Sequence, residues 1–88
     1  MTWTVYILEC VDGTYYTGIA ADLKRRINEH QRGVGARYTK GRAPVRLMYQ
    51  EIYSNRSDAT KREIKIKQLK KEKKRLLITS QSERIASV

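Results

Sequence analysis

Residues 3–18 read WTVYILECVDGTYYTG, in which two runs of aromatic and β-branched residues flank Asp12-Gly13. Such runs are typical of β-strands, and an Asp-Gly pair between them predicts a β-hairpin. Successive side chains of a strand point to opposite faces of a sheet. The length of the turn therefore decides whether Tyr6 and Tyr16 share a face.

Two turns are compatible with this sequence. A two-residue loop would place the tyrosines on opposite faces. A three-residue loop that begins at Val11 and ends with Gly13 in the left-handed conformation would pair Tyr6 with Gly18. Tyr6 and Tyr16 would then be diagonal neighbours about 7 to 8 Å apart on one face, with space beside the Tyr6 ring because Gly18 has no side chain. We predict this bulged hairpin.

A helix is expected next, over residues 23–32. Asp22 is a good N-cap, and Gly33 suits the left-handed position just past a helix. Residues 33–44 contain glycine and basic residues and are expected to form a loop, with room for one helical turn.

The next strand is expected over residues 45–53, where the apolar Val45, Leu47 and Tyr49 alternate with other side chains. Beyond it, a helical region begins near Asp58 and is expected to break into two helices near Lys70. The resulting order of elements is β-β-α-β-α-α, an α+β chain.

Residues 80–88 are small and polar, which predicts a flexible tail after a single domain that spans residues 1–79. Cys10 is the only cysteine, so we expect a small buried hydrophobe at a strand end, with neither a disulfide nor a thiolate metal site. The chain has no long apolar run and no recognisable leader, which predicts a cytoplasmic protein.

The formal net charge is +10, from 19 Lys and Arg against 9 Asp and Glu. This excess favours a polyanionic partner. Nucleic acid is favoured over an anionic membrane, because no amphipathic segment combines a broad apolar face with Trp or Phe. The sequence gives no sign of an obligate protein partner.

Residues 61–75 hold nine Lys or Arg and two Glu, a net charge of +7. A solvated helix face is the simpler interpretation, but this concentration favours phosphate contacts. Tyr38 lies among basic residues, where it either stacks on an unpaired base or belongs to a mobile linker. The candidate nucleic-acid-binding residues are Lys24, Arg25, Arg37, Tyr38, Lys40, Arg42, Lys61, Lys65, Lys70 and Lys74.

Five side chains could take part in phosphodiester chemistry: Tyr6, Tyr16, Arg26, His30 and Glu63. Each also has a simpler structural role. The tyrosines could only pack in a sheet, and Arg26 could be one more solvated cation. His30, one turn after Arg26, is as consistent with a hydrogen-bonded core histidine, and Glu63 with a salt bridge to Arg62, Lys67 or another helix.

Together these residues resemble the GIY-YIG nuclease superfamily, specifically its small single-domain bacterial members. The resemblance covers about residues 3–78 and rests on the hairpin with Tyr6 and Tyr16-Thr17-Gly18, on Arg26 and His30 at their spacings, and on Glu63. It implies a three-stranded antiparallel sheet packed with helices over residues 1–79. Where the family has isoleucine in its second triplet, this chain has Thr17.

The resemblance also implies roles. Tyr6 would be the general base, Tyr16 would orient by hydrogen bonding, and His30 would orient Tyr6 or transfer a proton. Arg26 would stabilise charge on the phosphoryl oxygens, and Glu63 would bind one Mg²⁺ or Mn²⁺. Gly13 and Gly18 would be structural.

The function implied by the resemblance is metal-dependent hydrolysis of DNA phosphodiesters, with low sequence specificity and a place in DNA repair or recombination. DNA is favoured over RNA as the substrate. The alternative is a DNA- or RNA-binding domain without catalysis on the same fold, because a fold alone does not fix a function.

Overall fold

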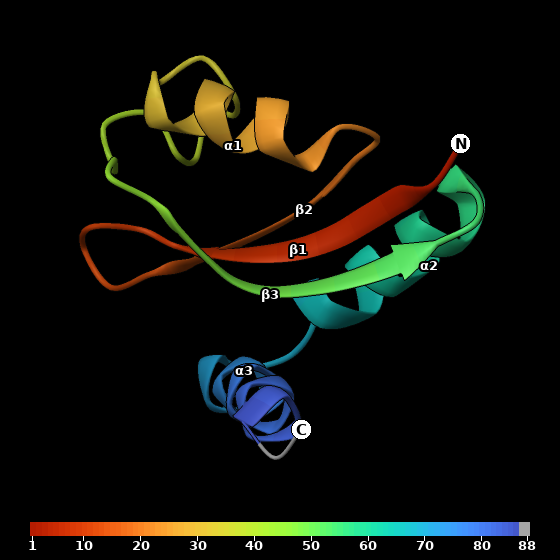
Figure 1. Cartoon of the computed structure of the whole chain (residues 1–88). Helices are drawn as coiled ribbons and strands as arrows, with labels where there is room; N and C mark the ends of the chain where they lie inside the picture. Colours follow the sequence, from red (N-terminus) through yellow and green to blue (C-terminus); the bar gives the residue numbers. More distant parts are fainter. Residues whose placement is uncertain (87–88) are drawn as a thin grey trace.

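The computed structural model describes residues 1–86 and has the predicted order of elements. The strands are β1 (Trp3–Glu9), β2 (Tyr15–Ala20) and β3 (Arg46–Tyr53), and the helices are α1 (Leu23–Gln31), α2 (Arg56–Lys67) and α3 (Lys71–Ala86). The three strands form one antiparallel sheet in the order β2-β1-β3, so β1 is central and the outer edge of β2 is free. Helix α1 covers one face, and α2 and α3 lie on the other (Figure 1).

The hairpin has the predicted bulged turn. Tyr6 pairs with Gly18, and Leu8 pairs with Tyr16. The turn is closed by the hydrogen bond from the Cys10 amide to Thr14 O (2.8 Å), and Gly13 has a φ of 83°, the left-handed conformation. A side chain other than glycine is disfavoured at such a φ, which explains the residue at this position.

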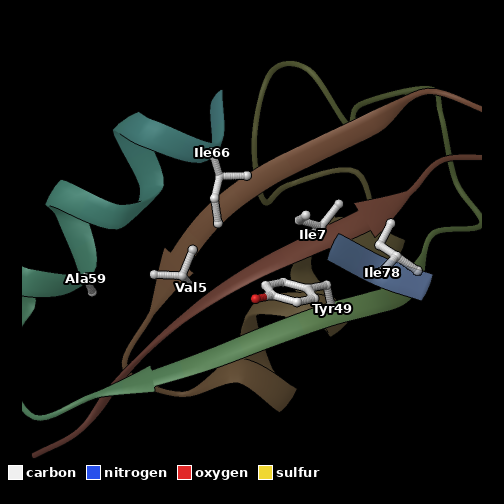
Figure 2. Close-up of a cluster of buried hydrophobic side chains, with 6 residues drawn as sticks. All are labelled: Val5, Ile7, Tyr49, Ala59, Ile66 and Ile78. Carbon is white, nitrogen blue, oxygen red and sulfur yellow. The ribbon is translucent and has the colours of Figure 1, made fainter. Parts of the chain in front are cut away.

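The alternation of β1 gives each face of the sheet its own core. Val5 and Ile7 pack with Tyr49, Ala59, Ile66 and Ile78 on the side of α2 and α3, as Figure 2 shows. Tyr6, Leu8 and Cys10 pack with Ala20 and Val45 on the side of α1. The predicted burial of Cys10 is confirmed, since it is 3% exposed and free.

A bulge in β3 corrects one expectation. Ile7 pairs with Tyr49, whereas the next residue, Leu8, pairs with Leu47, so Met48 is an extra residue. The extra residue inverts the alternation. Val45 therefore joins the core under α1, Tyr49 joins the opposite core, and Leu47 is 39% exposed.

The helices begin at the caps that local chemistry favours. Asp22 accepts a hydrogen bond from the Arg25 amide (3.1 Å) at the start of α1, as predicted. Asn55 caps α2 by accepting from the Asp58 amide (2.8 Å), so this helix begins two residues before Asp58. The predicted break near Lys70 is confirmed by the boundary between α2 and α3.

Helix α3 runs through Ala86, so residues 80–86 are helical where the sequence predicted a tail. The side chain of Gln81 donates to Gln50 O (2.8 Å) and accepts from the Gln50 amide (3.2 Å), which fastens this helix to β3. The domain boundary at residue 79 and the flexibility of the tail stay predictions, and residues 87–88 lie outside the described part of the chain.

Two side-chain contacts fasten the other helices to β3. Gln31 at the end of α1 holds Val45 by accepting from its amide (2.8 Å) and donating to its carbonyl (2.6 Å). Arg62 of α2 donates to both carboxylate oxygens of Glu51, and two tyrosine hydroxyls, from Tyr49 and Tyr53, donate to the same carboxylate. These contacts satisfy Glu51, whose pKa lies below its usual range despite burial because Arg62 and the tyrosines stabilise its charge.

Thr17 generates a test of this core. Its hydroxyl is buried, and within the described chain it has no hydrogen-bond partner. An unsatisfied buried hydroxyl costs about 1 to 3 kcal/mol. We therefore expect Thr17→Val to raise the free energy of unfolding by about 1 kcal/mol, measured by urea denaturation.

Thr39→Val is the matched control, because the Thr39 hydroxyl is equally buried but hydrogen-bonded to His30 and to Ala36. The same substitution there should lower the free energy of unfolding by about 1 to 3 kcal/mol. A loss of stability in Thr17→Val would contradict the expectation.

Candidate active site

Tyr6 and Tyr16 lie on the face of the sheet that α1 covers, with their ring centroids 6.3 Å apart. Gly18, opposite Tyr6, makes this arrangement possible. A Cβ atom on Gly18 would lie 2.6 Å from the Tyr6 hydroxyl oxygen and 3.0 Å from the Tyr16 ring. The space that the sequence predicted beside Tyr6 is therefore present, and only glycine fits it.

Helix α1 brings His30 to the tyrosine pair. Nε2 of His30 lies 2.8 Å from the Tyr6 hydroxyl, in a buried hydrogen bond. The His30 ring also lies against Tyr16, with the centroids 5.1 Å apart. His30 is 0% exposed and hydrogen-bonded, which agrees with the interpretation as a core histidine and leaves its catalytic role a prediction.

The loop after α1 fixes the orientation of the His30 ring. Nδ1 of His30 lies 2.7 Å from the hydroxyl oxygen of Thr39, and that hydroxyl donates to Ala36 O at 3.1 Å. Because the one hydroxyl proton of Thr39 is used in this way, Thr39 accepts from Nδ1–H. Nε2 is then unprotonated and accepts from the Tyr6 hydroxyl. A Cβ on Gly35 would lie 2.6 Å from Nδ1, so the close approach of this loop requires glycine.

Burial dominates the proton affinities at this site. It raises the pKa of Tyr6 to about 12, assisted by Tyr16 and to a smaller extent by Glu63, while Arg26 acts in the opposite direction. Burial also lowers the pKa of His30, and the positive charge of Arg26 lowers it further. Tyr6 is therefore a neutral phenol and His30 a neutral imidazole near pH 7, as the hydrogen-bond directions require.

Arg26 lies on α1 one turn before His30, and its positive charge acts on the Tyr6 hydroxyl. Its Nη1 pairs with Glu29 Oε1 at 3.1 Å, and its side chain is 35% exposed. Glu29 thus holds the guanidinium and leaves part of it open to solvent. Arg25, in contrast, is 77% exposed and pairs with the same carboxylate only at 3.5 Å.

Glu63 belongs to α2, which lies on the other side of the sheet from α1 (Figure 1). Its carboxylate influences the proton affinity of Tyr6 and is 17% exposed, with Lys67 Nζ 3.5 Å away. The salt bridge to Lys67 is one of the structural roles considered from the sequence.

Solvent reaches these groups unequally. Tyr6 is 0% exposed, whereas Tyr16, Arg26 and Glu63 are half-buried. The site thus has a closed centre, formed by Tyr6 and His30, and an open margin formed by the other three residues.

Tyr38 extends the site away from His30. Its ring stacks on Tyr16, with centroids 5.9 Å apart and an interplanar angle of 27°, and the guanidinium of Arg42 lies 4.2 Å from its centroid. Arg42 is in turn 3.6 Å from the carboxylate of Asp12 in the hairpin turn. Tyr38 therefore contacts both Tyr16 and Arg42.

The other predicted binding residues are distributed over several surfaces. Lys24 and Arg25 line a depression of about 520 Å³ beside α1, and Lys61 and Lys65 line one of about 250 Å³ beside Tyr53. Lys74 lines a third, of about 210 Å³, together with Tyr38. Arg37, Lys40 and Lys70 are exposed and line none of these three.

Four residues at or near the site were not predicted from the sequence: Glu29, Gly35, Thr39 and Lys71. Thr39 and Gly35 contact His30 only because the loop folds back on α1, and Lys71 contacts the hairpin turn from α3. The spacing of loop residues carries no periodic signal of this kind. The glycine content of residues 33–44 was the one indication that a close approach occurs there.

The donor set allows a hard cation with few protein ligands. Glu63 is the carboxylate whose charge affects the pKa of Tyr6. The described residues contain no group of three His, Cys, Asp or Glu that could hold a metal. Mg²⁺ is commonly bound by one or two carboxylates together with water and substrate phosphate. Glu63 fits that mode as a single carboxylate ligand, and a bound ion would supply positive charge there.

A three-stranded sheet that carries two tyrosines on one face, beneath a helix that supplies arginine and histidine, defines a small α+β domain. The family model of the GIY-YIG catalytic domain matches residues 2–76. The chain belongs to the GIY-YIG family.

Its relatives are small proteins of similar length. The chain is 51% identical to a UPF0213 protein of Halobacterium salinarum, over 83% of this chain and 95% of that protein. It is 53% identical to a UPF0213 protein of Staphylococcus aureus, over 84% and 90%. The solution NMR structure of a UPF0213 protein from Bacillus halodurans has 43% identity and a TM-score of 0.59, over 90% and 84% of the two chains.

A solution NMR structure of a protein from E. faecalis has 38% identity and a TM-score of 0.62, over 92% of this chain and 88% of that one. These matches agree with the observed order of elements. None of the helices in the described part of the chain is long and apolar enough to cross a membrane.

The contact between Gly18 and Tyr6 predicts a local disruption. Gly18→Ala should displace the Tyr6 ring and weaken its hydrogen bond to His30, because the added carbon would lie 2.6 Å from the hydroxyl oxygen. Overpacking of this kind lowers the free energy of unfolding by about 1 to 3 kcal/mol. The measurement is urea denaturation together with the NMR shifts of the His30 ring.

Gly13→Ala is the control, because its Cβ would meet nothing within 4 Å and only the left-handed φ of 83° is strained. It should lower stability by about 1 to 2 kcal/mol and leave the His30 ring shifts unchanged. Identical ring shifts in wild type and Gly18→Ala would contradict the proposed contact.

The lowered pKa of His30 predicts a pH dependence of stability. The unfolded chain takes up the histidine proton near pH 6.5 and the folded chain only at lower pH. The contribution of neutral His30 to the free energy of unfolding should therefore be fully present above about pH 6.5, and the free energy of unfolding should decrease as the pH falls below that value. His30 is the only histidine, so NMR titration of its ring measures the shift directly.

His30→Gln is the control for the stability measurement. Urea denaturation at about pH 7 and about pH 5.5 should show a smaller pH dependence in this variant than in wild type. A ring that titrates at or above about 6.5 in the folded protein would contradict the assignment.

Proposed function

We propose that the protein is a metal-dependent nuclease that hydrolyses phosphodiesters in DNA, with low sequence specificity. The observation that carries the proposal is the directed hydrogen bond from the Tyr6 hydroxyl to Nε2 of His30, beside Arg26. Membership of a family named for a catalytic domain supports it. The net charge of +10 supports a polyanionic substrate.

In this proposal Tyr6 and His30 move the proton of the attacking water together. A phenol with a pKa of about 12 is mainly protonated at neutral pH, so it accepts the water proton as it passes its own to Nε2 of His30. Nδ1–H remains bonded to Thr39 throughout and holds the ring in place. The proton ends on an imidazole that is buried, which suits a transient carrier and favours return of the proton to water.

Arg26 stabilises the negative charge that develops on the phosphoryl oxygens, and Glu29 orients its guanidinium. Glu63 would hold one Mg²⁺ or Mn²⁺ ion, which supplies positive charge at the phosphate when it is bound. Hydrolysis requires water at the Tyr6 hydroxyl, which is 0% exposed in the free protein. Substrate binding must therefore open the layer of side chains above it.

The complete burial of Tyr6 also favours a second candidate, a DNA- or RNA-binding domain without hydrolytic activity. In that case the Tyr6, His30 and Thr39 chain only stabilises the fold, and the basic side chains bind phosphates. The preference for DNA over RNA, a role in repair or recombination and a cytoplasmic location stay predictions.

The decisive experiment incubates the purified protein with plasmid, single-stranded DNA, branched DNA and RNA, each with Mg²⁺, Mn²⁺ or EDTA. We expect cleavage that requires the metal. Arg26→Ala should reduce it about 10²-fold to 10³-fold, the usual cost of removing one donor to a developing oxyanion. Glu63→Ala should reduce it through loss of metal binding.

Two variants serve as matched controls. Arg32→Ala removes an exposed arginine at the end of α1, and Glu72→Ala removes an exposed carboxylate of α3. Both should retain cleavage within about twofold, because solvated charges contribute little. Salt-sensitive binding without cleavage would support the binding domain and end the nuclease proposal, and cleavage that persists in Arg26→Ala and Glu63→Ala would indicate a contaminant.

A further inference from the structure

We propose that the free edge of β2 carries a subsite for a flanking nucleotide of a single nucleic-acid strand, centred on Lys74. The proposal rests on the proposed function and names the form of substrate that the same site takes. Its basis is a cavity of about 210 Å³ lined by Thr14, Tyr15, Tyr38, Lys71 and Lys74.

The cavity is joined to the candidate active site through Tyr38. This side chain lines the cavity and also stacks on Tyr16, which in turn contacts Tyr6 and His30. A nucleic-acid strand with one phosphate at the candidate active site would therefore place a neighbouring nucleotide at the cavity.

The position of the cavity follows from the sheet topology. Adjacent residues of a strand face opposite ways, so Tyr15 belongs to the core under α2 and α3, whereas Tyr16 belongs to the one under α1. The cavity contains Tyr15 and also Tyr38, the partner of Tyr16, and so it wraps around the outer edge of β2.

The two lysines of the cavity have different tasks. Lys71 Nζ donates to Gly13 O at 2.8 Å and lies 5.5 Å from the centroid of the Tyr15 ring. These contacts use its ammonium group to attach α3 to the hairpin turn. Lys74, one helical turn later, is partly buried and pairs with no carboxylate in the described part of the chain. A partly desolvated ammonium group that lies beside tyrosine side chains and has no carboxylate partner is well placed to donate a hydrogen bond to a phosphate oxygen.

The same geometry argues for one strand. Tyr38 stacks on Tyr16 and lies against the guanidinium of Arg42, so it forms one wall of the cavity. The opposite walls are the hairpin and α3, which Lys71 ties together. A cavity of about 210 Å³ between such walls accommodates the phosphate and sugar of one nucleotide, and a duplex does not enter it.

The test measures binding in EDTA, which separates it from cleavage. Fluorescence anisotropy would follow a labelled single-stranded DNA of about 12 nucleotides, a length typical of one binding domain. Lys74→Ala should weaken binding about tenfold, the effect of one charge-assisted hydrogen bond, and should lower the slope of log affinity against log salt by about 0.7.

Lys73→Ala is the matched control, because it removes the same charge from an exposed neighbour that does not line the cavity. It should weaken binding about twofold or less. For a duplex of the same length the two variants should behave alike. Circular dichroism of both variants would verify that α3 is retained.

The results separate the two proposals. Selective loss of single-strand binding in Lys74→Ala supports the subsite, whether or not the wild-type protein cleaves. Equal losses in Lys73→Ala and Lys74→Ala overturn the subsite, and cleavage by the wild-type protein would then leave the nuclease proposal intact. An equally selective loss with the duplex would overturn the restriction to a single strand.

Discussion

The hydroxyl of Tyr6 lies at the centre of the structure, fully buried between the sheet and α1, and a buried hydroxyl must find a hydrogen-bond partner. His30 provides that partner, and its own second nitrogen must then be satisfied by Thr39. This requirement constrains three segments at once: the hairpin, α1 and the loop that returns to β3. The two glycines that touch this chain, Gly18 and Gly35, leave the space in which it forms.

The same chain of hydrogen bonds has a chemical direction. Because Thr39 donates to a backbone carbonyl, the His30 nitrogen next to Tyr6 is an acceptor, and the phenol is oriented to give up its proton inward. A neutral imidazole and a neutral phenol are both favoured by burial. The arrangement therefore stabilises the folded protein and is equally compatible with a proton relay. For this reason, the burial of Tyr6 and His30 is consistent with both a nuclease and a binding domain.

The second organising feature is the free edge of β2. Side chains from the hairpin, the loop after α1 and α3 meet around it, although they belong to opposite faces of the sheet. The positive charge of residues 61–75 is spread over several surfaces, and only part of it faces this edge. Net charge accounts for attraction to a polyanion, whereas the position of a strand depends on the few basic groups that lack an internal partner.

Local rules were sufficient for most of the elements and for the tyrosine pair. The composition of residues 3–18, the left-handed preference of Gly13 and the cap at Asp22 act within a few residues, so the bulged hairpin and α1 follow from the sequence. The break near Lys70 was predicted in the same way. The length of α3 was not, because contacts to β3, such as those of Gln81, are invisible to local composition.

The sequence by itself identified the candidate groups of the site: a tyrosine pair, Arg26, His30 and Glu63. Tertiary structure decided how they meet. The β3 bulge at Met48, the return of Thr39 and Gly35 to His30, and the attachment of Lys71 to the hairpin turn each join residues through packing between separate elements. Their free energy comes from burial and from hydrogen bonds across the fold, and neither has a periodic or short-range signature in the chain.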